Sequence, residues 1–215
     1  MYGYKAVGIY QSDEEAEKHM HSNAYKPEMG NLKYEDVNND GKLDFQDKQV
    51  LGNTIPKITY GITAGLRYKG FDLNLLFQGL GQANAFTKNS FTQMELMYLT
   101  IVDSWKDAWT PENTNSKIPM LRFDSAWDGY ESSFWMHRID FLKLKNLQLG
   151  YTFPESISSK LGMKRLYLYA NASNVFTIMW KKGYEGYDPE RSTFDAGGSY
   201  YPSPKIFTFG LNLNF

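Results

Sequence analysis

The chain of 215 residues lacks cysteine, a sizeable net charge and any long apolar run. The absence of cysteine excludes disulfide frameworks, thiolate metal sites and cysteine nucleophiles. With 23 basic and 24 acidic residues the net charge is −1, so we expect no nucleic-acid partner. No run of about 18 apolar residues occurs, which predicts that no helix spans a membrane, although a barrel built of strands would also lack such a run.

Aromatic residues, in contrast, are plentiful. The chain has 16 Tyr and 14 Phe, which is high for a soluble α/β enzyme. Two classes of protein need such an excess. Transmembrane barrels place aromatic girdles at both membrane interfaces, and carbohydrate-binding β-sandwiches stack rings on sugars. Composition alone does not separate these two classes.

The last ten residues alternate between apolar and polar without interruption. One face of this segment carries Phe207, Phe209, Leu211 and Leu213. The opposite face carries Thr208, Gly210, Asn212 and Asn214. A period of two predicts a β-strand with one apolar side. About ten tilted residues are enough to cross a bilayer as a barrel strand, although an outer strand of a soluble sandwich would show the same alternation.

Further strands are predicted by the same alternation. They cover residues 58–68, 71–78, 139–153 and 164–177. Lys69-Gly70 predicts a tight hairpin turn between the first two. A change of phase between Leu144 and Leu147 predicts a bulge in the third.

The segments outside these strands are more irregular. We expect a short strand within 2–10, a helix that Ser12 caps with Glu15 in a capping box, and a helix near 92–109. The connections 11–57, 80–138 and 178–205 are long, whereas 69–70 and 154–163, at the opposite strand ends, are short. Long loops on one rim and short turns on the other are typical of outer-membrane barrels.

Several segments resemble the SusC-like TonB-dependent transporters of the Bacteroidetes outer membrane. They are Gly3–Glu15, Asn31–Asp44, Leu51–Gly61, Tyr68–Gly79, Gly183–Glu190 and Tyr201–Phe215. The resemblance extends nearly end to end and in order, and it is weakest over 85–135. It implies an all-β fold in which residues 1–215 supply the C-terminal five or six antiparallel strands of a transmembrane barrel of about 22 strands. The plug domain and the earlier strands would then be absent, and the long extracellular loops would carry short helices.

The resemblance also implies a function and a location. Such receptors are not enzymes, and they import oligomeric nutrients, glycans or peptides, under a SusD-like lipoprotein. Energy comes from the TonB complex through the N-terminal region. The barrel would contact outer-membrane lipid, with its long loops extracellular and its C-terminus periplasmic. Phe215 would be the terminal aromatic residue that the barrel assembly machinery reads.

One loop matches a calcium-binding pattern. Six residues follow the spacing of the twelve-residue EF-hand loop: Asp36, Asn38, Asp40, Lys42, Asp44 and Asp47. Their oxygens, with the carbonyl of Lys42 and a water at Asp44, would surround a structural Ca²⁺, and Gly41 would permit the sharp turn. Asp at the last position is shorter than the usual Glu, which weakens bidentate binding. The alternative is a polar turn without metal.

Aromatic residues of the long middle connection are candidate ligand contacts. They are Trp105, Trp109, Trp127, Tyr130, Phe134 and Trp135. Such rings stack on sugars, and the alternative is that they pack the loop itself or a lid protein. Two further functions stay open from the residues alone. One is a soluble, calcium-stabilised β-sandwich that binds carbohydrate, and the other is a glycoside hydrolase with a carboxylate pair such as Asp103 and Asp107.

Overall fold

The computed structural model describes residues 1–19, 21–86, 103–122, 126–180, 188–190 and 203–215. The chain forms two compact units. The first comprises Met1–Thr54, Asn84–Arg138 and Glu190–Tyr200, and the second comprises Ile55–Ala83, Ile139–Pro189 and Tyr201–Phe215. No helix among the described residues is long and apolar enough to cross a membrane.

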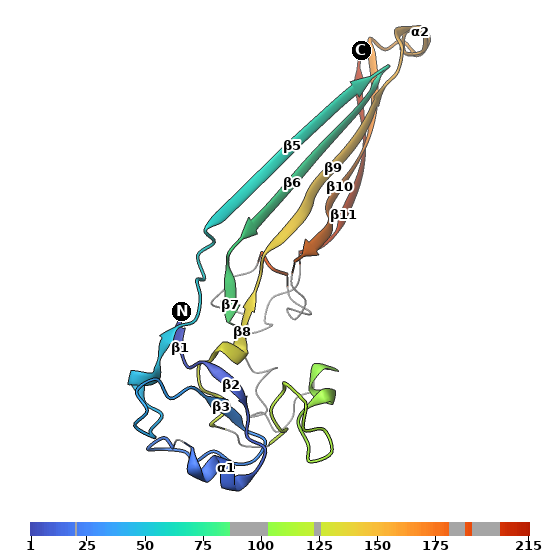
Figure 1. Ribbon diagram of the computed structural model, residues 1–215. Coiled ribbons are helices and arrows are strands. Elements are labelled where there is room, and N and C mark those ends of the chain that lie inside the picture. The colour runs from blue at the N-terminus through green and yellow to red at the C-terminus, as the bar shows by residue number, and fades with distance from the viewer. Residues whose placement is uncertain (20, 87–102, 123–125, 181–187, 191–202) are drawn as a thin grey trace. The chain divides into compact units, whose positions relative to one another are not determined.

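The second unit is an antiparallel sheet of five long strands in the order β11, β10, β9, β6, β5 (Figure 1). The strands are β5 (Ile58–Tyr68), β6 (Phe71–Gly81), β9 (Phe141–Thr152), β10 (Arg165–Met179) and β11 (Ile206–Asn214). All five strands that the alternation predicts are therefore confirmed, with small shifts at their ends. The all-β fold is confirmed with them.

The hairpin between β5 and β6 turns at Lys69 and Gly70, as predicted. Both residues have positive φ, 45° and 87°, which matches the right-handed twist of the flanking strands. A Cβ on Gly70 would lie 2.7 Å from the carbonyl oxygen of Thr152. Glycine is therefore required at this position both for its backbone conformation and for space.

A bulge interrupts β9 at Lys145, which confirms the bulge that the change of phase predicts. Leu76 and Phe77 are adjacent in β6, but they pair with Asn146 and Leu144, so Lys145 is left over. The extra residue restores the parity of the strand. Apolar side chains on both sides of the bulge consequently lie on the same face of the sheet.

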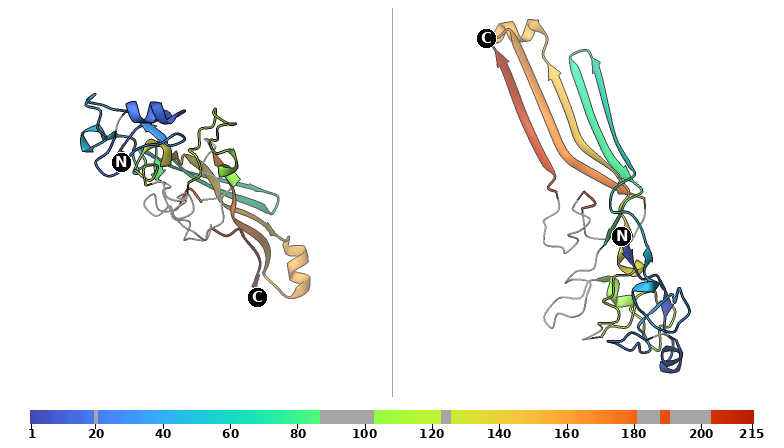
Figure 2. Two further views of the ribbon diagram at one scale, coloured as in Figure 1. Left: turned by 90° about the horizontal axis from the view of Figure 1, so that it is seen from below. Right: turned by 90° about the vertical axis from the view of Figure 1, so that its left-hand side faces the viewer.

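The short connections and the C-terminus lie at one end of this sheet. The turn between β5 and β6, the short helices α2 (Glu155–Ser158) and η4 (Ser159–Leu161), and the end of β11 gather there in each view (Figures 1 and 2). The connections at the other ends of the strands are the long ones. Short and long connections are thus segregated within the sheet, as the sequence predicts.

The first unit contains short strands that pair two by two. They are β1 (Tyr2–Gly3) with β4 (Gln49–Val50), β2 (Ala6–Ile9) with β3 (Leu32–Tyr34), and β7 (Asn84–Phe86) with β8 (Met136–Arg138). The single strand expected within 2–10 is therefore divided into two. One-turn helices η1 (Phe45–Asp47), η2 (Asp103–Asp107) and η3 (Ser133–Trp135) lie between them.

The helix α1 (Asp13–Lys18) begins as predicted, at Ser12. The Ser12 hydroxyl accepts a hydrogen bond from the Glu15 N–H at 3.2 Å, and the Glu15 carboxylate accepts one from the Gln11 N–H at 2.8 Å. Glu15 thus reaches one residue beyond the cap. Of the helix expected near 92–109, residues 103–107 form the short helix η2, and 92–102 lie outside the described residues.

Candidate functional site

The two faces of the five-stranded sheet differ in chemistry. One face is apolar and includes Ile62, Leu66, Phe77, Leu149, Phe207 and Phe209. The other includes Thr63, Asn74, Gln148, Asn171 and Asn212. On the apolar face Leu66 is 65% exposed and Phe209 78% exposed. Apolar side chains left open in this number need a nonaqueous surrounding.

A soluble β-sandwich would cover such a face with a second sheet. Among the described residues of the second unit the five strands form the only sheet. The apolar face therefore does not fit the sandwich alternative, whereas it fits the outer surface of a barrel in lipid.

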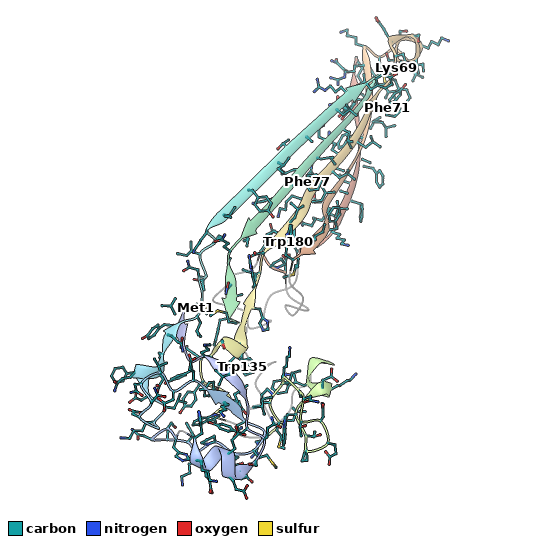
Figure 3. The ribbon with its side chains drawn as sticks, in the orientation of Figure 1. Met1, Lys69, Phe71, Phe77, Trp135 and Trp180 are labelled. Atoms are coloured by element: carbon teal, nitrogen blue, oxygen red, sulfur yellow. The ribbon has the colours of Figure 1, made fainter. Side chains whose placement is uncertain are left out.

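Aromatic rings stand at both ends of the sheet (Figure 3). Phe71 lies at the end that carries the short turn, and Trp180 lies at the opposite end, with Phe77 between them. The ring of Phe71 packs against that of Tyr151 with centroids 4.4 Å apart, and Trp180 is 60% exposed. Aromatic residues at two levels, with apolar residues between them, are typical of a membrane-facing strand surface.

The polar face carries a hydrogen-bonded network near the short-turn end. The hydroxyl of Tyr167 donates to the Asp72 carboxylate at 3.0 Å and accepts from the Gln148 amide at 3.2 Å. The guanidinium of Arg165 lies 5.4 Å from the centre of the Tyr167 ring. Three neighbouring strands are therefore joined by side chains as well as by their backbones.

Tyrosine rings on this face lie over glycines of adjacent strands. Tyr169 covers Gly210 and Tyr167 covers Gly150, so that a Cβ at either glycine would collide with a ring. On the apolar face Tyr60 covers Gly79 in the same way, and its hydroxyl donates to the Phe141 carbonyl at 2.8 Å. Such close approach is a use of glycine within strands that alternation alone does not predict.

The predicted calcium loop forms a turn in which side-chain carboxylates accept hydrogen bonds from the loop's own backbone N–H groups. Both carboxylate oxygens of Asp36 accept backbone N–H groups, from Asp40 at 3.3 Å and from Gly41 at 2.9 Å. Gly41 has φ of 73°, as expected for the turn, and Asn39 has φ of 59°. The Asp40 carboxylate accepts the Lys42 N–H at 2.8 Å.

Asp47, the last predicted ligand, is fully buried. Its two oxygens accept the N–H groups of Val37 at 3.0 Å and Asp44 at 2.9 Å, and it forms a reciprocal capping pair with Asp44. Across the described residues no three His, Cys, Asp or Glu side chains stand close enough to hold a metal ion. The six residues share one loop but do not form an ion cage, so calcium binding stays a prediction.

The candidate sugar-binding rings lie inside the first unit. Trp109 and Trp127 belong to one buried cluster, and Trp105 and Trp135 belong to another, against which Phe134 also packs. The indole N–H of Trp127 donates to the Leu32 carbonyl at 2.7 Å, and that of Trp135 donates to the Asp128 carbonyl at 2.8 Å. Tyr130 packs beside the first cluster. Burial favours the packing alternative, and ligand contact by these rings stays a prediction.

Two contacts of the first unit were not predicted. The buried carboxylate of Asp128 accepts the Leu32 N–H and the Asn31 side-chain N–H, both at 2.7 Å. The hydroxyl of Tyr10 is 2.9 Å from Nδ1 of His19. Burial raises the pKa of Tyr10 above its usual range and lowers the pKa of His19. Asn31 and Asp128 lie 97 residues apart, so no local sequence pattern predicts their contact.

Phe215, the predicted assembly signal, is 69% exposed at the short-turn end of the sheet. Its carbonyl oxygen accepts a hydrogen bond from Lys164 Nζ at 2.9 Å. The ring is thus accessible. Its role as a signal stays a prediction.

Comparison with known proteins gives relatives along the whole chain. It is 30% identical over its full length to the TonB-dependent receptor P3 of Formosa agariphila and covers 22% of that protein. It is 28% identical to the TonB-dependent receptor SusC of Bacteroides thetaiotaomicron, over 84% of this chain and 17% of SusC. The chain therefore spans about a fifth of the length of these relatives. No protein-family model matches it.

Solved structures with the same fold include RagAB, described as a peptide transporter. One RagAB structure matches the whole chain with a TM-score of 0.70 at 23% identity, and the chain covers 23% of that protein. A second, described as the peptide importer in the open-open state, gives a TM-score of 0.68 at 23% identity. These likenesses confirm the fold. The curated relatives confirm the predicted family resemblance.

Proposed function

Because this chain belongs with the SusC-like TonB-dependent receptors, we propose that its sheet forms part of the wall of an outer-membrane barrel that imports an oligomeric nutrient. The observation that carries the proposal is the division of the sheet into an exposed apolar face and a hydrogen-bonded polar face. In a barrel of this kind the apolar face contacts lipid and the polar face lines the lumen. The sheet then acts by transport and not by catalysis.

The orientation of the sheet follows from its connections. Outer-membrane barrels have short turns on the periplasmic side and long loops outside the cell. The turn at Lys69–Gly70 and the C-terminus would then be periplasmic, and the first unit, built from the long connections, would be extracellular. Cysteines introduced at Lys69 and at Gln46 in the intact protein test this orientation. A membrane-impermeant maleimide should label Gln46→Cys on whole cells and should label Lys69→Cys after lysis alone.

For the cargo we propose a glycan or a peptide, taken up with energy from the TonB complex and with a SusD-like lipoprotein as partner. The name SusC and the description of RagAB as a peptide importer support this class without deciding between the two. Cells that lack the gene, and complemented cells, would be given fluorescent oligosaccharides and fluorescent peptides of equal size. Uptake of one class that requires both the gene and TonB identifies the cargo. Equal uptake in all strains contradicts the proposal.

We also propose Ca²⁺ as a structural ion for the loop of Asp36 to Asp47. The support is the spacing of its oxygen ligands together with the sharp turn at Gly41, although its carboxylates would have to turn away from the backbone to bind the ion. Calorimetry with CaCl₂, on the wild-type receptor and on Asp36→Asn and Asp40→Asn variants, decides the point. A loss of heat in both variants supports the site, and the absence of a binding heat in the wild type removes it.

A further inference from the structure

A buried ion pair lies on the polar face of the sheet. Nζ of Lys143, in β9, donates to both carboxylate oxygens of Asp188, at 2.9 and 3.1 Å. Lys143 stands between Gln78 of β6 and Thr177 of β10. The two charged side chains are 3% and 7% exposed.

Burial sets this pair apart from the surface ion pairs of the chain. Lys5 and Glu35 form a contact of the same 2.9 Å length, but their side chains are 50% and 37% exposed. Exposed pairs contribute little to stability, whereas removing one member of a buried pair leaves an uncompensated charge out of water. Apolar residues of similar size would often stabilise such a position equally well. The charges at Lys143 and Asp188 are therefore better explained by the position that they impose than by the stability that they add.

The pair fixes the connection between β10 and β11 at two places. Asp188 follows β10 in the chain, and its carboxylate also accepts the N–H of Ser203 at 3.1 Å, just before β11 begins. One residue further on, the Pro204 carbonyl accepts the side-chain N–H of Asn174 at 3.0 Å. Asn174 has φ of 54° and lies where the register of β10 with β9 shifts.

We propose that Lys143 and Asp188 form a charged clasp that holds Asp188 and Ser203, two described residues between β10 and β11, at the polar face of the sheet. Lys143 holds the Asp188 carboxylate, that carboxylate holds the Ser203 amide, and the irregular β10 position holds Pro204 through Asn174. The clasp fixes where the chain enters β11. It rests on the proposed function only in that the polar face is there assigned to the lumen, which would place the clasp on the wall of the conduit.

Hydrogen exchange on the purified full-length receptor tests the clasp without cargo, TonB or lipoprotein, so its outcome is separate from that of import. Lys143→Met keeps the apolar stem and removes the charge, and Asp188→Asn keeps the shape and removes the charge. Lys5→Met is the matched control, because it breaks a pair of equal length at an exposed site. We expect the Ser203 amide to exchange at least about tenfold faster in both clasp variants and to change by less than about twofold in the control.

Lys143→Arg separates loss of charge from loss of lysine, since a guanidinium also pairs with a carboxylate, and we expect wild-type protection in it. If Lys143→Met does not give the heat-modifiable folded form, Asp188→Asn and Lys143→Arg still decide. Exchange of Ser203 within twofold of wild type in Asp188→Asn overturns the clasp. So does equal acceleration in Lys5→Met.

Discussion

The two units use the same excess of aromatic and apolar residues in opposite ways. In the first unit Trp109 and Trp127 are 1% and 2% exposed, and they pack with tyrosines in a closed core. In the second unit Phe207, Phe209 and Leu211 stand open on a single layer of strands. A core in water is stabilised by removing its apolar surface from the solvent, whereas a strand surrounded by lipid can leave its apolar side chains uncovered by protein. An excess of aromatic and apolar residues therefore does not distinguish the two units. The two-residue period of apolar side chains does, because it identifies the strands of the second unit.

The largest effect that tests this contrast should come from truncating a core ring. Trp127→Ala removes a ring that packs on Tyr34, with centroids 5.7 Å apart, and a hydrogen bond to Leu32. We expect the first unit to lose about 3–5 kcal/mol of unfolding free energy. Phe209→Ala, on the open face, is the control, and in detergent it should lose far less. Urea unfolding followed by amide exchange measures both, at Leu32 for Trp127→Ala and at Ala170, the β10 partner of Phe209, for Phe209→Ala. Equal losses would remove the contrast.

A charged residue placed on the apolar face tests whether that face contacts lipid. Phe209→Arg should destabilise the assembled barrel by about 2–4 kcal/mol if the residue lies near the bilayer midplane. Thr208→Arg, one residue earlier on the polar face, should be tolerated. The heat-modifiable fraction in membranes reports both variants. Greater damage from Thr208→Arg would reverse the assignment of the faces.

Glycines in the sheet should differ according to the ring that covers them. Gly210→Val places a side chain where Tyr169 lies, whereas the nearest atom to a Cβ at Gly61 is 3.8 Å away. We expect Gly210→Val to cost about 1–3 kcal/mol through overpacking and Gly61→Val to cost less. Thermal unfolding of the two variants in detergent measures the difference. Equal melting temperatures would show that the ring moves aside freely.

Deletion of Phe215 from the full-length receptor should act on assembly and not on the finished protein. Its ring is exposed and its backbone carbonyl is held by Lys164, so little packing is lost. We expect less receptor in the outer membrane and unchanged cargo affinity per assembled molecule. Phe215→Tyr keeps an aromatic end and serves as the control. Normal amounts of the deletion variant would contradict the role.

The smallest effect should be a pH dependence confined to the first unit. Burial lowers the pKa of His19 and of His137 below 6.5, so that below this pH the unfolded chain binds more protons than the folded one. The unfolding free energy of the first unit should therefore fall as the pH is lowered from about 7 to about 5. Amide exchange at Leu32 over this range measures the slope. The slope should flatten in His19→Gln, and a slope of the opposite sign would contradict the prediction.

The strands of the sheet could be predicted from the sequence because each strand alternates locally. The bulge in β9 could also be predicted, because the apolar residues change from even to odd positions between Leu144 and Leu147. The first unit could not be predicted in the same way. Its core depends on pairs such as Asp128 with Asn31, and each short strand has too few residues to show a period.

The candidate sites show the same division. The spacing of Asp36, Asp40 and Asp47 correctly predicted a sharp turn, because turn chemistry is local. Both carboxylate oxygens of Asp47 accept backbone N–H groups. This could not be predicted, because residue spacing does not determine where a side chain points. Lys143 and Asp188 each look ordinary in the sequence, and only the fold brings them together.

The order of the five strands also limits how the sheet can be completed. Because successive neighbours alternate in direction, the outer strands β5 and β11 run the same way. They cannot pair with each other in the antiparallel manner of bacterial barrels. An odd number of additional strands between these two edges is needed for an all-antiparallel closure. This count can be checked in the complete barrel independently of its cargo.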